Sequence, residues 1–497
     1  MKKAILILLL WVSFPLAVQA GSADAQQAMR LFQKHHYHDA ALLMYAQLSH
    51  RTIEEPYDIQ RNFGMICLAN ARFYNRLHQA AKPLQVEYLK RMVQADDQRK
   101  SAASRLARLY LGKALLADGR FTPAIAALTQ FLEISGVDEI DRYEARVDLG
   151  AAHHAAGQKI RATKIWSALP VDEPHVAALL AAAYQQSGLH PEKILPLAQG
   201  AAKTLLTANK PIPVQCASAL LDIYGRRNMV REGFEIIAHT QLATFAREEV
   251  IGDHKVLRFY DAGLFRHLSA FYSQAAINAF NTAKKSANTR TSVTATFLAG
   301  EAYAFSRRMD EASRAMDELL AAAPPNALSR LAQVRQLAYG LNTHSPKTTR
   351  LDLDGLLSEK SSVDQLSDIV LLCAQLGVDC PDALKRATLL WQQAQGRPPA
   401  NLGMALGHYY RARQDHGRTL HYLEAARDKS RKNRIEANPP AMLADLAWAY
   451  YKNRQYSEAL EIYFTMSKQF PAVRQIQVAL QGIYSMEQQS AGDAKIF

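Results

Sequence analysis

Apolar positions in residues 443–471 follow a helical period in two runs. Ala447 and Tyr450 stand three residues apart in the first run, and Ala459 and Tyr463 stand four apart in the second. The polar sequence Lys-Asn-Arg-Gln separates the runs. Steps of three and four place these side chains on one face of a helix, and a polar interruption marks a turn. The segment therefore predicts two helices that fold back on each other.

Two small residues twelve positions apart recur in the same pattern elsewhere in the chain. The pairs are Ala28 with Ala40, Gly112 with Ala124, Gly150 with Ala162, Gly263 with Ala275, Gly300 with Ala312, and Ala447 with Ala459. Small side chains let two helices approach closely where they cross. A larger apolar residue follows the second member by four positions in five pairs, where it would fill the space beside the crossing. The spacing predicts a repeated helix–turn–helix unit, with Pro324 and Pro471 ending two of the second helices.

These residues resemble the tetratricopeptide repeat family, whose unit of about 34 residues is a pair of helices. The best matches are Gly300, Tyr303, Ala312, Leu319 and Pro324, and then Leu446, Ala447, Tyr450, Tyr456, Ala459, Tyr463 and Pro471. Looser copies carry Lys193 or Thr419 in place of the second small residue. The resemblance extends over about residues 22–490. It implies an all-α fold, a right-handed superhelical solenoid of antiparallel helix pairs.

Breaks in the helical period divide the chain. We expect N-terminal repeats over residues 21–339, an irregular loop or joint over residues 340–362, and C-terminal repeats over residues 363–471. Residues 472–497 should form a capping helix and a tail. An apolar stripe supports this last helix; it consists of Val473, Ile476, Leu480, Ile483 and Tyr484.

The first twenty residues have the features of a signal peptide. Lys2 and Lys3 precede an apolar stretch, and small residues at Val18 and Ala20 suit cleavage before Gly21. This predicts an exported protein, periplasmic or secreted, with an uncleaved anchor as the alternative. No later stretch has eighteen uninterrupted apolar residues, so no transmembrane segment is expected after cleavage.

Net charge narrows the classes of binding partner, and the number of cysteines limits the possible disulfides. The chain has a formal net charge of +13, which attracts acidic polymers or surfaces, and export makes nucleic acid the poorest candidate. The four cysteines, Cys67, Cys216, Cys373 and Cys380, are too few for a disulfide scaffold. Buried free thiols are the main expectation. A turn at Gly377 leaves open a disulfide between Cys373 and Cys380.

The sequence contains no recognisable enzymatic motif. The patterns of zinc proteases, phosphate-binding loops, serine hydrolases and paired CxxC sites are all missing. His35, His36 and His38 fall in a predicted turn, and only Asp39 accompanies them as a further ligand. A solvated polar turn is the better interpretation than a metal site. We therefore expect no enzyme, no cofactor and no metal.

Binding in a helical solenoid is expected along the concave face, which one helix of each pair lines. In the family, residues one, four and five positions beyond the first small residue point away from the second helix. Here these positions include Lys113, His154, Glu301, Phe305, His408, Arg411, Trp448, Tyr451 and Lys452. The last five are the predicted partner-binding site, because aromatic and basic side chains suit an extended peptide or a sugar chain. The alternative is that Trp448 and Tyr451 pack against the capping helix.

Together these features predict a non-enzymatic exported scaffold that binds a protein partner in an envelope assembly or export machinery. The alternative is a glycan-binding or enzyme-accessory superhelix that acts on an anionic envelope polysaccharide. A basic run at residues 427–434 fits that alternative, or is a solvated loop. A regulatory subunit that senses a peptide is a third, weaker hypothesis.

Overall fold

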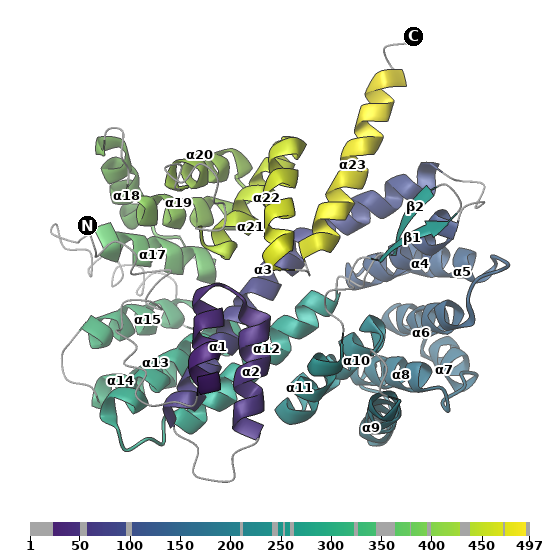
Figure 1. Cartoon of the computed structure of the whole chain (residues 1–497), viewed down its shortest axis with the longest axis horizontal. Coiled ribbons are helices and arrows are strands. Elements are labelled where there is room, and N and C mark those ends of the chain that lie inside the picture. Colours follow the sequence, from purple (N-terminus) through teal and green to yellow (C-terminus); the bar gives the residue numbers. More distant parts are fainter. Residues whose placement is uncertain are drawn as a thin grey trace. The chain divides into compact units, whose positions relative to one another are not determined.

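The computed structural model describes residues 23–49, 57–95, 102–208, 212–240, 247–251, 254–258, 263–322, 327–343, 363–377, 379–394, 399–427, 438–470 and 473–493. Figure 1 shows that helices dominate. The chain is an all-α helical-repeat protein, as the sequence predicts. The predicted signal peptide, residues 1–20, lies outside the described residues.

The chain forms two compact units, and each combines segments that are distant in the sequence. Unit 1 comprises Met1–Phe73 and Ser273–Thr465, and unit 2 comprises Tyr74–Tyr272 and Met466–Phe497. The boundaries fall within three helices: α3 (Tyr57–Ala95), α12 (Gly263–Ala283) and α22 (Tyr456–Gln469).

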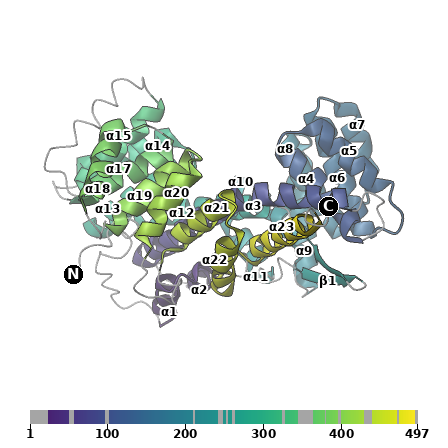
Figure 2. The ribbon, with the colours of Figure 1, turned by 90° about the horizontal axis from the view of Figure 1, so that it is seen from above.

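The remaining helices of unit 1 are α1 (Ala23–Gln33), α2 (Tyr37–Ser49), α13 (Thr289–Phe305), α14 (Met309–Ala322), α15 (Ala327–Thr343), α17 (Val363–Leu376), α18 (Pro381–Gln393), α19 (Ala400–Ala412), α20 (His416–Ala426) and α21 (Pro440–Lys452). Those of unit 2 are α4 (Ala102–Ala117), α5 (Phe121–Leu132), α6 (Glu139–Ala155), α7 (Lys159–Ser167), α8 (Pro174–Ser187), α9 (Pro191–Thr207), α10 (Val214–Arg226), α11 (Val230–His239) and α23 (Arg474–Asp493). Helices α4 to α8 stack in neighbouring layers within unit 2 (Figure 2).

The predicted helix crossings are confirmed at four glycines. A Cβ added to Gly112, Gly150 or Gly300 would overlap the side chain four positions after the paired small residue, and one added to Gly407 would overlap the side chain four positions after Thr419. These side chains are Leu128, Trp166, Met316 and Leu423, respectively. Each is buried, so it fills the space that the missing glycine side chain leaves open. The small residues thus set the distance between the two helices of a pair.

One turn geometry joins the two helices of most pairs. The middle residue of a three-residue turn has positive φ, and the following residue donates its N–H to a carbonyl five positions earlier. Examples are Gln158 to His153 and Arg308 to Tyr303, at 2.8 and 2.9 Å. This is the Schellman ending of a helix. Arg307 and Arg454 occupy the left-handed position with φ of 63° and 61°, although glycine is the residue that usually adopts it.

The Gly263 and Ala275 pair was wrongly predicted to span a turn. Both residues lie in the continuous helix α12. The intervening residues contain no glycine, proline, asparagine or aspartate that would end a helix. Elsewhere on this helix, Phe280 contacts Gly64 of α3.

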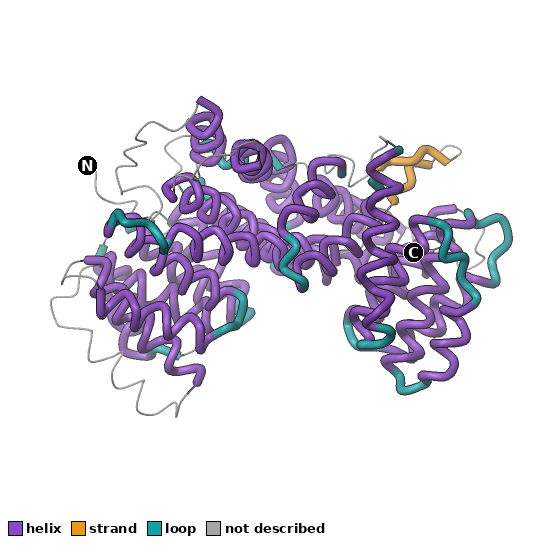
Figure 3. Tube along the Cα trace, turned by 90° about the horizontal axis from the view of Figure 1, so that it is seen from below, coloured by secondary structure: helices purple, strands orange, loops and turns teal. Residues whose placement is uncertain are grey.

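The structure adds two elements that the sequence pattern did not predict. Helix α3 has 39 residues and continues through Pro83. Strands β1 (Arg247–Ile251) and β2 (His254–Arg258) form an antiparallel hairpin with Arg247 opposite Arg258 (Figure 3). The all-α class stands, with this hairpin as an insertion in unit 2.

Helices lie on both sides of the predicted break near residue 340, and one more lies at the C-terminus. Helix α15 continues to Thr343, and α17 begins at Val363. The rest of the predicted irregular segment, residues 344–362, lies outside the described residues. The predicted apolar stripe, which begins at Val473 just before α23, is buried except at Tyr484, which is half-buried. Gly482 of that helix packs on Tyr88 of α3 within unit 2.

Candidate functional site: the inner row and the C-terminal cluster

Pairs of polar side chains link first helices that follow one another along the chain; two pairs are ion pairs and two join a histidine to an aspartate. Each pair includes at least one buried side chain, and each lies within one unit. We call this set the inner row. It consists of Lys113 of α4 with Glu144 of α6, Asp222 of α10 with His267 of α12, Glu301 of α13 with Arg335 of α15, and His408 of α19 with Asp445 of α21.

The inner row follows from the helix crossings. Lys113, Glu301 and His408 each come directly after a crossing glycine, so their side chains point away from the second helix of their own pair. They meet the next first helix instead and are at most 8% exposed. The positions predicted to line an open groove are thus occupied by contacts between helices.

Sequence reasoning did not identify the partners in these pairs. They lie 31, 34 and 37 residues after Lys113, Glu301 and His408. These separations are close to one repeat length, so the signal was a charge of opposite sign one repeat later. The prediction considered each repeat alone and missed it.

Glu301 contacts two arginines and a tyrosine in the inner row. Arg335 Nε donates to its Oε1 at 2.6 Å and the Tyr339 hydroxyl donates to the same oxygen at 2.7 Å. Arg72 of α3 donates to Oε2 at 3.2 Å. Burial by itself would raise the pKa of Glu301, but Arg335 and Arg72 hold it below its ordinary value. The carboxylate therefore stays ionised in the interior of unit 1.

Asp368 of α17 lies near the same group, but its pKa is shifted in the opposite direction. Burial raises its pKa to about 7, and Glu301 and Asp364 add to the rise while Arg335 opposes it. Near neutral pH this carboxyl is therefore close to half protonation, unlike Glu301.

The structure brings the five predicted binding residues together. With Asp445 they form what we call the C-terminal cluster: His408, Arg411, Asp445, Trp448, Tyr451 and Lys452. His408 Nδ1 lies 2.6 Å from Asp445 Oδ2, and Arg411 Nε lies 3.9 Å from Asp445 Oδ1. Asp445 is a member that the sequence analysis missed.

Cations lie against the aromatic rings of the cluster. The guanidinium carbon of Arg411 is 5.6 Å from the centre of the Trp448 ring, and Lys452 Nζ is 4.8 Å from it. Trp448 stacks on Tyr451 at 5.0 Å between ring centres. The distances of Arg411 and Lys452 from the Trp448 ring are both in the range of cation–π attraction. The rings therefore hold the two cationic groups in place.

Exposure within the cluster differs from the prediction of an open aromatic patch. His408, Trp448 and Tyr451 are buried, at 4%, 4% and 5% exposure, whereas Lys452 is exposed and Arg411 is partly exposed. The accessible part of the C-terminal cluster is therefore basic rather than aromatic.

No protein-family model and no curated protein matches this sequence. Similar solved structures include yeast Tom70, at 13% identity and a TM-score of 0.28, covering 94% of this chain and 96% of that one. The P58(IPK) TPR domain has 11% identity and a TM-score of 0.20, over 94% and 98% of the two chains. Naa15/Naa10 bound to HypK-THB has 13% identity and a TM-score of 0.21, over 94% and 92%. The chain is similar to tetratricopeptide-repeat proteins. The likeness concerns the helical-repeat architecture alone.

The other predicted groove positions are not part of the C-terminal cluster. His154 stacks on Trp166 at 6.1 Å between ring centres, and Phe305 is half-buried at the end of α13. Lys113 and Glu301 belong to the inner row. These positions support the packing of the repeats. Among the predicted groove positions, the accessible lysine and arginine side chains are Arg411 and Lys452.

His416 is a further group beside the cluster that the sequence analysis missed. It is the first residue of α20, and its ring meets Trp448 edge-on at 6.5 Å. Burial lowers its pKa, and the neighbouring charges of Arg411 and Lys452 lower it further. At neutral pH His416 is therefore an uncharged neighbour of the two cations.

The described residues contain no group of three or more His, Cys, Asp or Glu side chains placed to hold a metal ion. His35, which the sequence analysis weighed as a ligand, lies 3.0 Å from the Tyr37 hydroxyl. Within the part of the chain that the structure describes, no helix combines the length and apolar character that a membrane span requires.

Proposed function

We propose that this protein is a non-enzymatic exported scaffold whose C-terminal cluster binds an extended, acidic segment of a protein partner. Repeats of the tetratricopeptide type typically mediate protein–protein interaction. The partner belongs to an assembly or export machinery of the cell envelope. The signal-peptide features of residues 1–20 and the basic charge of the chain support this location.

One observation carries the proposal: two cationic side chains from neighbouring first helices converge on one indole ring. Arg411 comes from α19 and Lys452 from α21. A carboxylate that approaches them gains two charge-assisted contacts, because cations fixed against aromatic rings lose little side-chain freedom on binding. Asp445 is the carboxylate of the cluster, and its nearest partner is His408. An acidic segment thus matches the accessible basic groups.

Replacing Arg411 and Lys452 together by glutamine should weaken capture of the partner by roughly tenfold or more, as expected for charged groups at the centre of an interface. Both changes keep the buried Trp448 and Tyr451, so helicity and melting temperature should stay near the wild-type values. The measurement is recovery of bound envelope proteins on the immobilised variant, with the bound proteins then identified by mass spectrometry.

A matched control removes two exposed cations from unit 2, Arg231 and Lys203, in the same way. This variant has the same net charge as the first and should bind normally. Equal binding by wild type and the Arg411→Gln, Lys452→Gln variant would refute the site. Capture that survives proteolysis of the extract but is lost at moderate salt would support the anionic polysaccharide instead.

Export predicts that the mature chain begins at Gly21. The small residues Val18 and Ala20 after an apolar stretch are the reason for this expectation. Intact mass of the protein from an envelope fraction measures it. A full-length mass with tight membrane association would contradict cleavage and favour an anchor.

A further inference from the structure

Two cysteines of unit 1 flank the turn between α17 and α18. Cys373 lies in the last turn of α17, and Cys380 is the residue that precedes α18. Gly377, between them, has φ of 71°, so the chain reverses there. On one straight helix a seven-residue step would separate the cysteines by about 10 Å along the axis, beyond the reach of a disulfide. The turn removes that obstacle.

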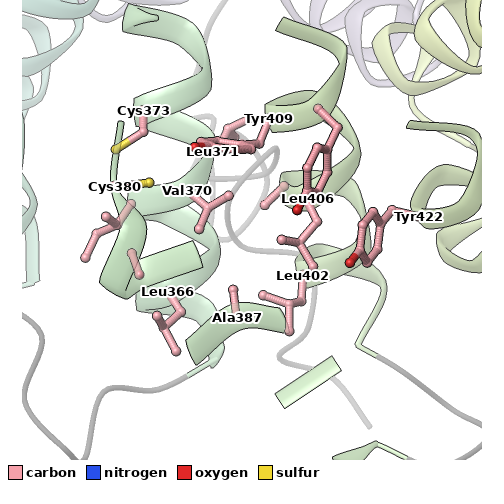
Figure 4. Close-up of a cluster of buried hydrophobic side chains, with 14 residues drawn as sticks. Leu366, Val370, Leu371, Cys373, Cys380, Ala387, Leu402, Leu406, Tyr409 and Tyr422 are labelled. Carbon is pink, nitrogen blue, oxygen red and sulfur yellow. The ribbon is translucent and has the colours of Figure 1, made fainter. Parts of the chain in front are cut away.

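In the structure both cysteines are free thiols, as the sequence mainly predicted, and they belong to one hydrophobic cluster. Both are buried in the cluster that also contains Val370, Leu406 and Tyr409. Figure 4 draws both sulfur atoms in this cluster, one at the end of α17 and the other at the start of α18. Burial raises the pKa of the Tyr409 phenol to about 12, and both thiols add to that rise while Arg413 opposes it.

We infer that Cys373 and Cys380 are a disulfide site, oxidised when the chain folds in the presence of a thiol-reactive disulfide. The thiolate of Cys380 attacks one sulfur of a low-molecular-weight disulfide such as oxidised glutathione, forms a mixed disulfide and releases one thiol. The thiolate of Cys373 then attacks the Cys380 sulfur and releases the second thiol. The two protons of the protein thiols end on the released thiols, and the oxidant takes up the two electrons.

The order of attack follows from the position of Cys380. It stands at the N-terminal end of α18, where the helix dipole favours a negative charge. Closing the bond links two helices across a short turn, and the surrounding apolar side chains then shield it from reductants. The cross-link would fix the angle at which α18 leaves α17. This inference goes beyond the proposed function, because it needs neither export nor a partner in the test tube.

The other two cysteines provide an internal control. Burial raises the pKa of Cys67 and of Cys216, and no thiol contributes to either shift. They lie on α3 and α10, away from the turn at Gly377 along the chain. Both should keep free thiols under conditions that oxidise the Cys373 and Cys380 pair.

Mass spectrometry tests the inference directly. The full chain is refolded from a reduced, denatured state in a glutathione redox buffer, then denatured, alkylated without reductant and digested with trypsin. Cleavage after Lys360 and Lys385 leaves both cysteines on one peptide, residues 361–385. That peptide should be two hydrogen atoms lighter than the reduced form and carry no label. The peptides with Cys67 and Cys216 should be labelled.

Two results for the wild-type protein would overturn the proposal. One is a peptide 361–385 labelled at both cysteines, and the other is a peptide that carries a glutathione adduct. In a Cys373→Ala variant, Cys380 should become labelled or glutathionylated, whereas Cys67→Ala should leave the light peptide unchanged. Because the wild-type peptide mass decides the question, poor folding of Cys373→Ala would not affect it. A failed partner-capture experiment would leave this result intact.

Discussion

Replacing Glu301 by glutamine should lower the free energy of unfolding of unit 1 by about 3 kcal/mol or more, because the change leaves the buried guanidinium group of Arg335 without its carboxylate. Arg335 is 7% exposed and donates to Glu301 at 2.6 Å. Arg72 contacts the other carboxylate oxygen. Glutamine keeps the size of the side chain but removes the negative charge that both arginines face.

The effect can be measured by denaturant unfolding followed by circular dichroism. Glu311 of α14 provides the matched control, since it forms an exposed ion pair with Arg308. Glu311→Gln should change stability by no more than about 0.5 kcal/mol. Equal losses for the two variants would show that burial of the Glu301 group does not contribute the expected energy.

Replacing Trp166 by alanine should destabilise unit 2 by about 3–5 kcal/mol, because it creates a large cavity in a closely packed crossing. Trp166 is 1% exposed, and its ring fills the space beside Gly150. Its Nε1 donates to the Val147 carbonyl at 3.0 Å, and its ring meets Tyr184 edge-on at 5.6 Å. The substitution removes all three contacts at once.

Ile160 on the same helix is the control for Trp166. It is 88% exposed, so Ile160→Ala should stay within about 0.5 kcal/mol of wild type. Thermal and denaturant melting of both variants would give the comparison. A small loss for Trp166→Ala would mean that the glycine crossing can collapse around the missing ring.

The sequence by itself predicted the pairing of helices because that information is local. A small residue, a short turn and an apolar residue at fixed offsets lie within one repeat. Gly150 with Trp166 and Gly300 with Met316 therefore meet as predicted. The same offsets failed at Gly263, since a helix continues wherever no residue stops it, whatever the spacing of small residues.

The predicted binding residues show a different division. The sequence correctly grouped His408, Arg411, Trp448, Tyr451 and Lys452, because residues one, four and five beyond a crossing share a helix face. It did not predict that Trp448 and Tyr451 are buried, leaving Lys452 exposed and Arg411 partly exposed. The exposure of a helix face depends on the neighbouring element that packs on it. The sequence of that helix alone does not show this neighbour.

The inner row depended most on tertiary structure. The sequence predicted Lys113 to line a groove. In the structure it is paired with Glu144, which belongs to the next repeat. Charges that look uncompensated within one repeat are paired when first helices stack side by side. Local sequence thus determined the helices and their crossings. Only the stacking of repeats decided which polar side chains are buried partners, because burial and charge pairing are properties of two helices at once.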